Sequence, residues 1–132
     1  MTREQLTVWV RAYERAWRTA GTDVLAELFT PDASYLSAPF EEPYRGLESI
    51  AAFWDTHREG ADEAFEMDSE VVACEGDTGV VRLEVRYGEP RNRIYRDLWV
   101  VRLAEDGRCA EFEEWPFWPP GSGGSFAAGP SA

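Results

Sequence analysis

The 132 residues are 44% hydrophobic and carry a net charge of −12, and every one of the thirteen basic residues is Arg. A chain of this length and hydrophobic content can bury one core, whereas so acidic a surface repels phosphate backbones and anionic lipid headgroups. The composition therefore predicts a single globular domain that binds neither nucleic acid nor a membrane surface.

The inventory of metal-binding residues is small. Cys74 and Cys109 stand far apart, the only histidine is His57, and no spacing typical of a zinc site occurs. No apolar stretch approaches the roughly 20 residues of a spanning helix, and the N-terminus lacks the apolar core of a signal peptide. We expect a cytoplasmic protein that works without a metal or any other cofactor.

Apolar residues at helical spacing begin the chain. They fall at i, i+3, i+4, i+7 and i+11, and they are Leu6, Trp9, Val10, Tyr13 and Trp17. Gly21 ends this helix, and Thr22 or Asp23 is expected to cap a short helix that carries Val24, Leu25, Leu28 and Phe29. The sequence thus predicts a long amphipathic helix followed by a short one.

The next segment mixes turn and strand signals. Residues 30–32 (T-P-D) predict a turn, 33–36 (A-S-Y-L) a short strand, and 38–46, with two prolines, a loop. A third helix is expected over 47–59. Its buried stripe holds Leu47, Ile50, Ala51 and Trp54 and continues to His57 and Arg58.

After Gly60 the hydrophobic pattern changes to the alternation typical of strands. Strands are expected over 65–74, 80–87, 94–104 and 108–118, with turns at 76–79 (G-D-T-G) and 104–107 (A-E-D-G). Residues 119–132 are rich in Gly, Pro and Ser and predict a disordered tail, which leaves residues 1–118 as the domain. Helices followed by antiparallel strands predict an α+β fold, with the helices packed on one face of a strongly bent sheet.

Four landmarks carry a resemblance to a known superfamily. They are R-A-Y-E-R-A-W (11–17), L-F-T-P-D-A-S-Y (28–35), Y-R-G (44–46) and D-G-R-C-A-E-F-E-E-W (106–115). Together they resemble the NTF2-like fold over roughly residues 4–118, and within it the SnoaL-like, polyketide-cyclase-type domains, with ketosteroid isomerase as a more distant relative. The resemblance implies a cone-shaped α+β barrel with a deep apolar pocket, commonly dimeric through the outer sheet face.

The chemistry of the isomerase transfers only in part. The resemblance places its oxyanion-donating tyrosine on Tyr13 and its second oxyanion-hole acid near Trp99, two residues from Asp97. Its general base falls on Ser37, which makes classical steroid isomerisation an unfavourable expectation. SnoaL-type cyclases also carry an acid on this strand, and Asp97 could occupy a shifted version of that role.

Strand alternation assigns side chains to the two faces of the sheet. On the strand 94–104, the set with the large aromatics and without Arg faces the interior: Tyr95, Asp97, Trp99, Val101 and Leu103. The same rule turns Phe112 and Glu114 inward on the last strand. The pocket candidates are therefore Tyr13, Trp17, Tyr35, Trp54, His57, Tyr87, Asp97, Trp99, Phe112 and Glu114.

Asp97 has two interpretations. As a structural residue it forms a buried ion pair, with Arg45 or another Arg that reaches inward. As a functional residue it is desolvated by Trp99 and Tyr95, which raises its pKa toward neutrality and suits proton transfer. His57 has a bland alternative too, as a surface residue near a helix C-terminus.

Three functions follow from these assignments. The favoured one is a cofactor-independent cyclase, isomerase or hydrolase for an apolar oxygenated metabolite. Asp97 moves a proton in it, His57 assists, and Tyr13 donates a hydrogen bond to a developing oxyanion. The alternatives are a non-catalytic ligand-binding module and a scaffold dimer whose cavity is filled by side chains. The apolar outer residues Leu98 and Val100 favour a homodimer.

Overall fold

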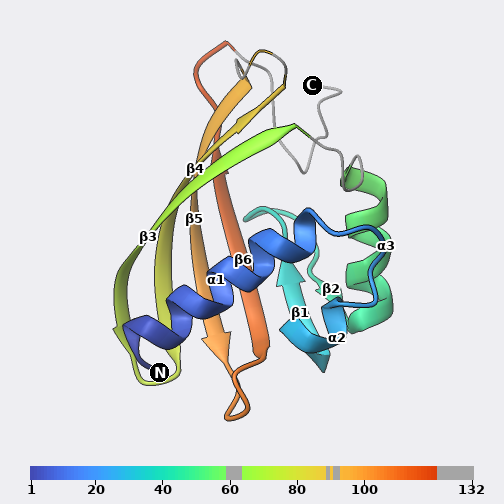
Figure 1. Cartoon of the computed structure of the whole chain (residues 1–132), viewed down its shortest axis with the longest axis vertical. Helices are drawn as coiled ribbons and strands as arrows, with labels where there is room; N and C mark the ends of the chain where they lie inside the picture. The colour runs from blue at the N-terminus through green and yellow to red at the C-terminus, as the bar shows by residue number, and fades with distance from the viewer. Residues whose placement is uncertain (59–63, 89, 91–92, 122–132) are drawn as a thin grey trace.

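The computed structural model describes residues 1–58, 64–88, 90 and 93–121 (Figure 1). The expected strands after Gly60 are confirmed within about two residues at each end, and residues 122–132 of the expected tail lie outside the described residues. The elements run in the order α1 (Arg3–Trp17), α2 (Leu25–Leu28), β1 (Phe29–Leu36), β2 (Tyr44–Arg45), α3 (Leu47–His57), β3 (Phe65–Glu75), β4 (Thr78–Tyr87), β5 (Arg93–Leu103) and β6 (Cys109–Phe117).

The strands form one open sheet in the order β2-β1-β6-β5-β4-β3. Neighbours from β3 to β6 pair antiparallel, as expected, but β1 pairs parallel to β6, so the sheet is mixed. Helix α1 crosses one face of the long strands, and α2 and α3 lie beside β1 and β2 (Figure 1). The α+β architecture predicted from the sequence is confirmed, with helices gathered on one side of a curved sheet.

Helix α1 forms where the periodicity places it. Thr2 caps it, because its hydroxyl accepts the Gln5 backbone N–H while the Gln5 side chain accepts the Thr2 N–H. All five residues of the expected stripe are buried, together with Ala16. The apolar face of α1 therefore supplies one wall of the core.

The segment before and within β1 departs from expectation. Residues 30–32 do not turn but belong to β1, and its pairing with β6 shifts register between Phe29 and Ser34. Pro31 is exposed within this irregular stretch, where its missing N–H breaks no regular ladder. Helix α2 begins at Leu25 without a side-chain cap, so the expected cap at Thr22 or Asp23 is wrong.

Two further boundaries differ from the predicted ones. Tyr44 and Arg45 form the short strand β2 inside the expected loop. Helix α3 ends at His57, and its fully buried residues are Ile50, Phe53 and Trp54, with Leu47 and Ala51 only half-buried. Phe53 belongs to the buried stripe because it lies at i+3 from Ile50.

Arg58, directly after α3, connects α3 to the C-terminal end of α1 through hydrogen bonds. Its guanidinium donates to the carbonyl oxygens of Ala16, Thr19 and Gly21 at distances of 3.1, 2.9 and 2.8 Å. The Ala16 carbonyl, which also accepts the Thr19 N–H at 3.0 Å, lies at the end of α1, and the Thr19 and Gly21 carbonyls lie in the loop after it. A cation there also interacts favourably with the helix dipole.

We therefore expect Arg58→Ala to lower the free energy of unfolding by about 1–3 kcal/mol, because three carbonyl groups lose a charged donor. Urea denaturation measures the change. Arg96→Ala is the matched control, since Arg96 is 80% exposed and, among the described residues, pairs with Glu84 alone; it should leave stability nearly unchanged. Equal effects of the two substitutions would contradict the capping role of Arg58.

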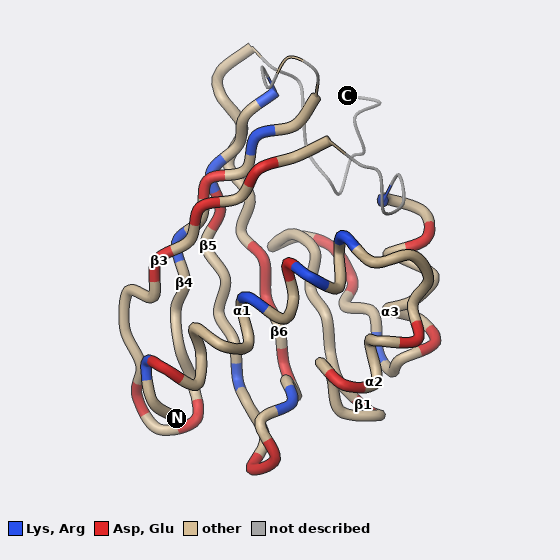
Figure 2. Tube along the Cα trace, in the orientation of Figure 1, with Lys and Arg blue, Asp and Glu red and all other residues tan. Residues whose placement is uncertain are grey.

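The alternation predicted for the long strands is confirmed by burial. On β5, the side chains of Tyr95, Asp97, Trp99, Val101 and Leu103 are buried, and on β4 those of Val81, Leu83, Val85 and Tyr87. The opposite face carries acids on β3, both acids and arginines on β4, and arginines on β5 (Figure 2). Arg86 there forms ion pairs with Glu66, Asp68 and Glu84. The concave face is therefore the aromatic core, and the outer face is charged.

None of the helices in the described part of the chain is long and apolar enough to cross a membrane.

Candidate functional site

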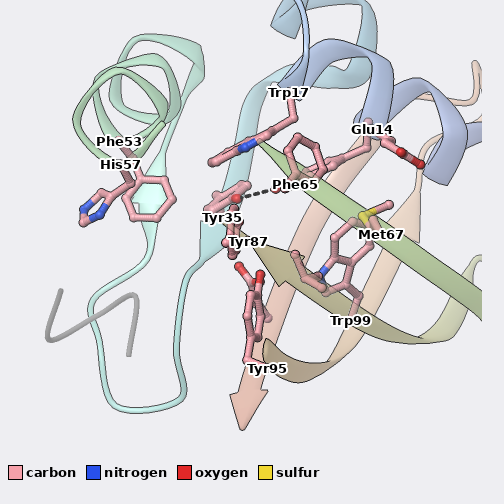
Figure 3. Close-up of a pocket in the computed structure, with 13 residues that line it drawn as sticks. Glu14, Trp17, Tyr35, Phe53, His57, Phe65, Met67, Tyr87, Tyr95 and Trp99 are labelled. Carbon is pink, nitrogen blue, oxygen red and sulfur yellow. Dashed lines mark hydrogen bonds between the residues drawn. The ribbon is translucent and has the colours of Figure 1, made fainter. Parts of the chain in front are cut away.

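A small pocket opens between α1, α3 and the concave face of the sheet (Figure 3). Its volume is about 30 Å³. Ligand pockets commonly measure about 300–1,000 Å³, whereas a water needs only about 10–15 Å³. The aromatic side chains thus fill most of the interior but leave a void. The lining residues are Tyr13, Glu14, Trp17, Tyr35, Phe53, His57, Phe65, Met67, Val85, Tyr87, Tyr95, Trp99 and Glu114.

Aromatic rings from separate elements meet at the deep end of this pocket. The ring centroids of Tyr13 and Trp99 lie 4.5 Å apart, and those of Tyr35 and Phe112 lie 4.7 Å apart. Figure 3 shows Phe53 and His57 on α3 with their rings side by side, at a centroid distance of 4.5 Å. The wall is therefore made of apolar faces with few polar groups.

Two carboxyl groups lie in this aromatic interior. Asp97 on β5 is 1% exposed and Glu114 on β6 is 4% exposed. In the antiparallel register Glu114 pairs with Trp99, and Asp97 pairs with Pro116, so the two acids are diagonal neighbours on the inner face. Their carboxyl groups lie close enough for each to alter the pKa of the other.

One proton shared between the two carboxyl groups explains this contact. Burial raises the pKa of Asp97 to about 6, although the hydrogen bonds from Glu114 and from Trp99 hold it down. Burial and the neighbouring Asp97 together raise the pKa of Glu114 well above its ordinary value. Both causes favour a proton held within the pair, and they place it on Glu114 rather than on Asp97.

The surroundings of Asp97 decide between its two sequence interpretations. The indole Nε1–H of Trp99 donates to Asp97 Oδ2 at 3.0 Å, and the backbone N–H groups of Leu98 and Trp115 also hold its pKa down. No Arg in the described part of the chain pairs with Asp97, and Arg45 is exposed on β2. The buried ion pair is therefore wrong for the described residues, and the raised pKa matches the alternative.

Buried phenol groups adjoin the carboxyl pair. The hydroxyls of Tyr13 and Tyr35 share a hydrogen bond of 2.7 Å. Burial raises the pKa of Tyr13, Tyr35 and Tyr95 well above the ordinary value, and the negative charges of Glu114 and Asp97 add to the rise. These phenols remain neutral hydrogen-bond donors at physiological pH.

His57 and Cys109 are the other residues whose side chains could take part in catalysis. His57 is half-buried at the pocket edge, and burial lowers its pKa, so its imidazole is neutral at pH 7. Burial raises the pKa of the Cys109 thiol to about 12, which keeps it protonated. Within the described ranges, no three His, Cys, Asp or Glu side chains converge as metal ligands.

The structure brings most of the expected site residues together. Seven of the ten line the pocket: Tyr13, Trp17, Tyr35, His57, Tyr87, Trp99 and Glu114. Trp54, Asp97 and Phe112 are buried but do not line it. Phe53, Phe65 and Met67 also line the pocket but were not among the candidates. Strand alternation places Phe65 and Met67 on one face of β3, and helical spacing places Phe53 beside Ile50.

Comparison with known proteins now adds to the geometry. The model of the SnoaL-like domain family matches residues 10–112. The chain belongs to the SnoaL-like family. A search of the curated proteins finds no match.

Solved structures confirm the NTF2-like fold of this SnoaL-like domain. A putative SnoaL-like polyketide cyclase from Jannaschia sp. CCS1 is 22% identical with a TM-score of 0.64, and the match covers 83% of this chain and 85% of that one. A steroid delta-isomerase from Pseudomonas aeruginosa is 21% identical with a TM-score of 0.63, over 94% and 85% of the chains. A computationally designed 17-OHP binder is 16% identical with a TM-score of 0.62, over 86% and 92%. Because identities are this low, the likeness concerns the fold.

Proposed function

We propose that this SnoaL-like domain binds a small apolar molecule with one polar oxygen and exchanges a proton with it, without a cofactor. The observation that carries the proposal is the Asp97–Glu114 pair, which is buried beside the pocket without a cationic partner among the described residues. The reaction class is isomerisation, cyclisation or hydrolysis by acid-base catalysis.

The energetic cost of the pair supports a functional role. A carboxyl group in an aromatic interior lowers stability unless a cation or several donors satisfy it. Here Asp97 has only uncharged donors, and no cation pairs with it among the described residues. Buried ionisable groups that destabilise a core are often found at functional sites, where their shifted pKa serves the chemistry.

Within the pair, Glu114 is the group that meets a ligand. Glu114 lines the pocket, whereas Asp97 lies behind it and acts through it. Protonated Glu114 and the neutral Tyr13 hydroxyl donate hydrogen bonds to the ligand oxygen, and Asp97 keeps Glu114 protonated by raising its pKa. The proton that Glu114 gives to this oxygen is balanced by the one that His57 removes from the ligand, and exchange with solvent restores both groups. His57, neutral at the pocket edge, accepts a proton from the ligand.

The remaining expected residues bind rather than react. Trp17, Tyr35, Tyr87 and Trp99 line the pocket, while Trp54 and Phe112 support these rings from behind. Classical steroid isomerisation is not proposed, because Ser37 stands where the resemblance places the base and is itself buried.

A second candidate is a ligand-binding module without catalysis. Like the enzyme, it takes a guest of ordinary size only if side chains move, because the pocket volume is about 30 Å³. In this case the carboxyl pair selects the ligand and transfers no proton.

A thermal-shift screen with polyketide, terpenoid, steroid and aromatic-acid compounds tests the proposal. A ligand at about 100 times its Kd stabilises the native state by about 2.7 kcal/mol. Glu114→Gln should reduce the shift of any hit, because the amide cannot give up a proton and changes the donor at the pocket wall. Hits that shift both proteins equally would place the ligand elsewhere, and a screen without hits would count against a ligand pocket.

We also propose a homodimer through the outer sheet face. Leu98 on β5 and Trp115 on β6 are register partners there, and both are exposed, as are Ile94 and Phe117. Leu98→Glu should shift a dimer to a monomer in sedimentation, while Val8→Glu on α1, also at an exposed apolar residue, should not. A wild-type monomer at about 100 µM would contradict this proposal.

A further inference from the structure

The pocket reaches the surface between α1, α3 and β3. Three of its lining residues, Glu14 of α1, His57 of α3 and Met67 of β3, are half-buried, whereas the other ten are buried. Figure 3 shows Glu14, Phe65 and Met67 on one side of this space and Phe53 and His57 on the other. Because the volume is about 30 Å³, a guest larger than about two waters enters only after a wall has moved.

The wall formed by β3 has fewer neighbours than the other walls. Within the described part of the chain, β3 lies at an edge of the sheet and pairs with β4 alone. Arg86 on the outer face pairs with Glu66 and Asp68 and so holds the backbone of β3 in the sheet. Phe65 is the first residue of the strand, and its buried ring faces inward. We therefore expect the Phe65 side chain to leave the pocket more readily than rings on the inner strands.

Arg18, directly after α1, covers the ring of Phe65. Its guanidinium carbon lies 3.8 Å from the ring centre, and its Nη2 donates to the Phe65 carbonyl oxygen at 3.1 Å. The same nitrogen donates to Glu14, one turn earlier, at 2.9 Å. The Arg18 side chain is 41% exposed, so water screens these contacts and each one breaks at low cost. The cover over Phe65 is thus well fitted but weakly held.

A second arginine connects the other end of α1 to the same strand. Arg3 donates to the carbonyl oxygen of Val71. Val71 lies about 20 Å from Phe65 along an extended strand and does not line the pocket. Of these two contacts between α1 and β3, the one made by Arg18 is therefore the one at the pocket.

We infer that the contact between Arg18 and Phe65 is the gate of the pocket. A guest enters between α1 and β3 when the guanidinium leaves the ring and the Phe65 side chain turns outward, and the guest is enclosed when the contact forms again. The inference rests on the ligand pocket proposed above and adds its route of entry. Opening leaves the acid pair in place, because Asp97 and Glu114 belong to the inner strands β5 and β6.

A cysteine in place of Val85 reports this opening without a ligand. Val85 is buried, lines the pocket and is the register partner of Met67. The reaction of Val85→Cys with iodoacetamide, followed by mass spectrometry of the digested protein, should be slow. Adding Arg18→Ala should raise its rate by about tenfold. Cys109 is buried outside the pocket, so it reports global unfolding and its rate should not change.

Phe65→Ala tests whether Arg18 acts through the ring. In the Val85→Cys protein, this substitution should itself raise the rate, and Arg18→Ala should then add little, because the ring that it covers is gone. Equal effects of Arg18→Ala with and without the ring would overturn the gate. Arg18→Lys keeps the positive charge but not the planar group and should give a smaller rise. It decides the test if Arg18→Ala does not fold, and no rise would overturn the inference.

Arg3→Ala is the matched control, because it removes the contact of the other exposed arginine with β3. It should leave the rate at Val85→Cys unchanged. Equal rises in Arg3→Ala and Arg18→Ala, or a parallel rise at Cys109, would reduce Arg18 to a stabilising contact and overturn the inference. So would a Val85→Cys thiol that already reacts as fast as the half-buried Cys74. Each of these results leaves the proposed function standing, whereas the expected rates together with a thermal-shift screen without hits would count against that function alone.

Discussion

Asp97→Asn should stabilise the fold at neutral pH by up to about 3 kcal/mol, the free energy that corresponds to a pKa raised from 3.8 to about 6. Below about pH 4 both the folded and the unfolded protein carry the proton, and the residue costs nothing. Between about pH 4 and 6 the unfolded chain releases a proton that the folded protein keeps, so the stability of the wild type falls as pH rises. Above about pH 6 the full cost is present.

Urea denaturation from about pH 4 to pH 8 measures this difference. The stability of Asp97→Asn should exceed that of the wild type by an amount that grows with pH and levels off above about pH 6. Glu105→Gln, at an exposed turn, should follow the wild-type curve. A variant that is less stable than the wild type at every pH would mean that Asp97 is structurally required, against the role proposed here.

Substitutions in the Asp97–Glu114 pair should lower turnover, although Asp97→Asn is expected to raise stability. Once a substrate is found, Glu114→Gln should lower kcat by about 100- to 10,000-fold, because the amide has no proton to transfer. Asp97→Asn should also lower kcat, because Glu114 loses the neighbour that raises its pKa and keeps it protonated, while the Kd of a neutral ligand changes little.

Glu113→Gln is the control on the same strand. Glu113 lies next to Glu114 but faces the outer side, where its carboxylate accepts from the Trp115 indole N–H at 3.1 Å. It should retain wild-type turnover. Unchanged turnover in Glu114→Gln and Asp97→Asn would remove the pair from the mechanism and favour the non-catalytic ligand-binding module.

The contrast between these expectations is the signature of a functional acid pair. The same substitution that removes a buried charge stabilises the fold and impairs the chemistry, since activity and stability place opposite demands on the interior. Substitution of a residue that only packs in the core would lower the free energy of unfolding and leave its pH dependence unchanged.

The local hydrophobic pattern predicted the elements whose structure depends only on which side chains are buried. The stripe of α1 and the alternation of β5 follow from which side chains must leave water, so both were predicted residue by residue. Around Pro31 the pattern failed, because a proline suggests a turn whereas β1 continues through it beside the parallel partner β6. The pairing of β1 with a strand more than 70 residues later has no local signal.

By itself, the sequence determined the family and the α+β class. It also determined the inward direction of Asp97, Trp99 and Glu114, because period-two alternation fixes the face of the sheet on which a side chain lies. Only the tertiary structure decided how those side chains meet. The register of β5 against β6 makes Asp97 and Glu114 neighbours that share one proton, and the packing of α1 closes rings over them. Strand register depends on contacts between distant segments, so the pair and its raised pKa values could not be read from either strand alone.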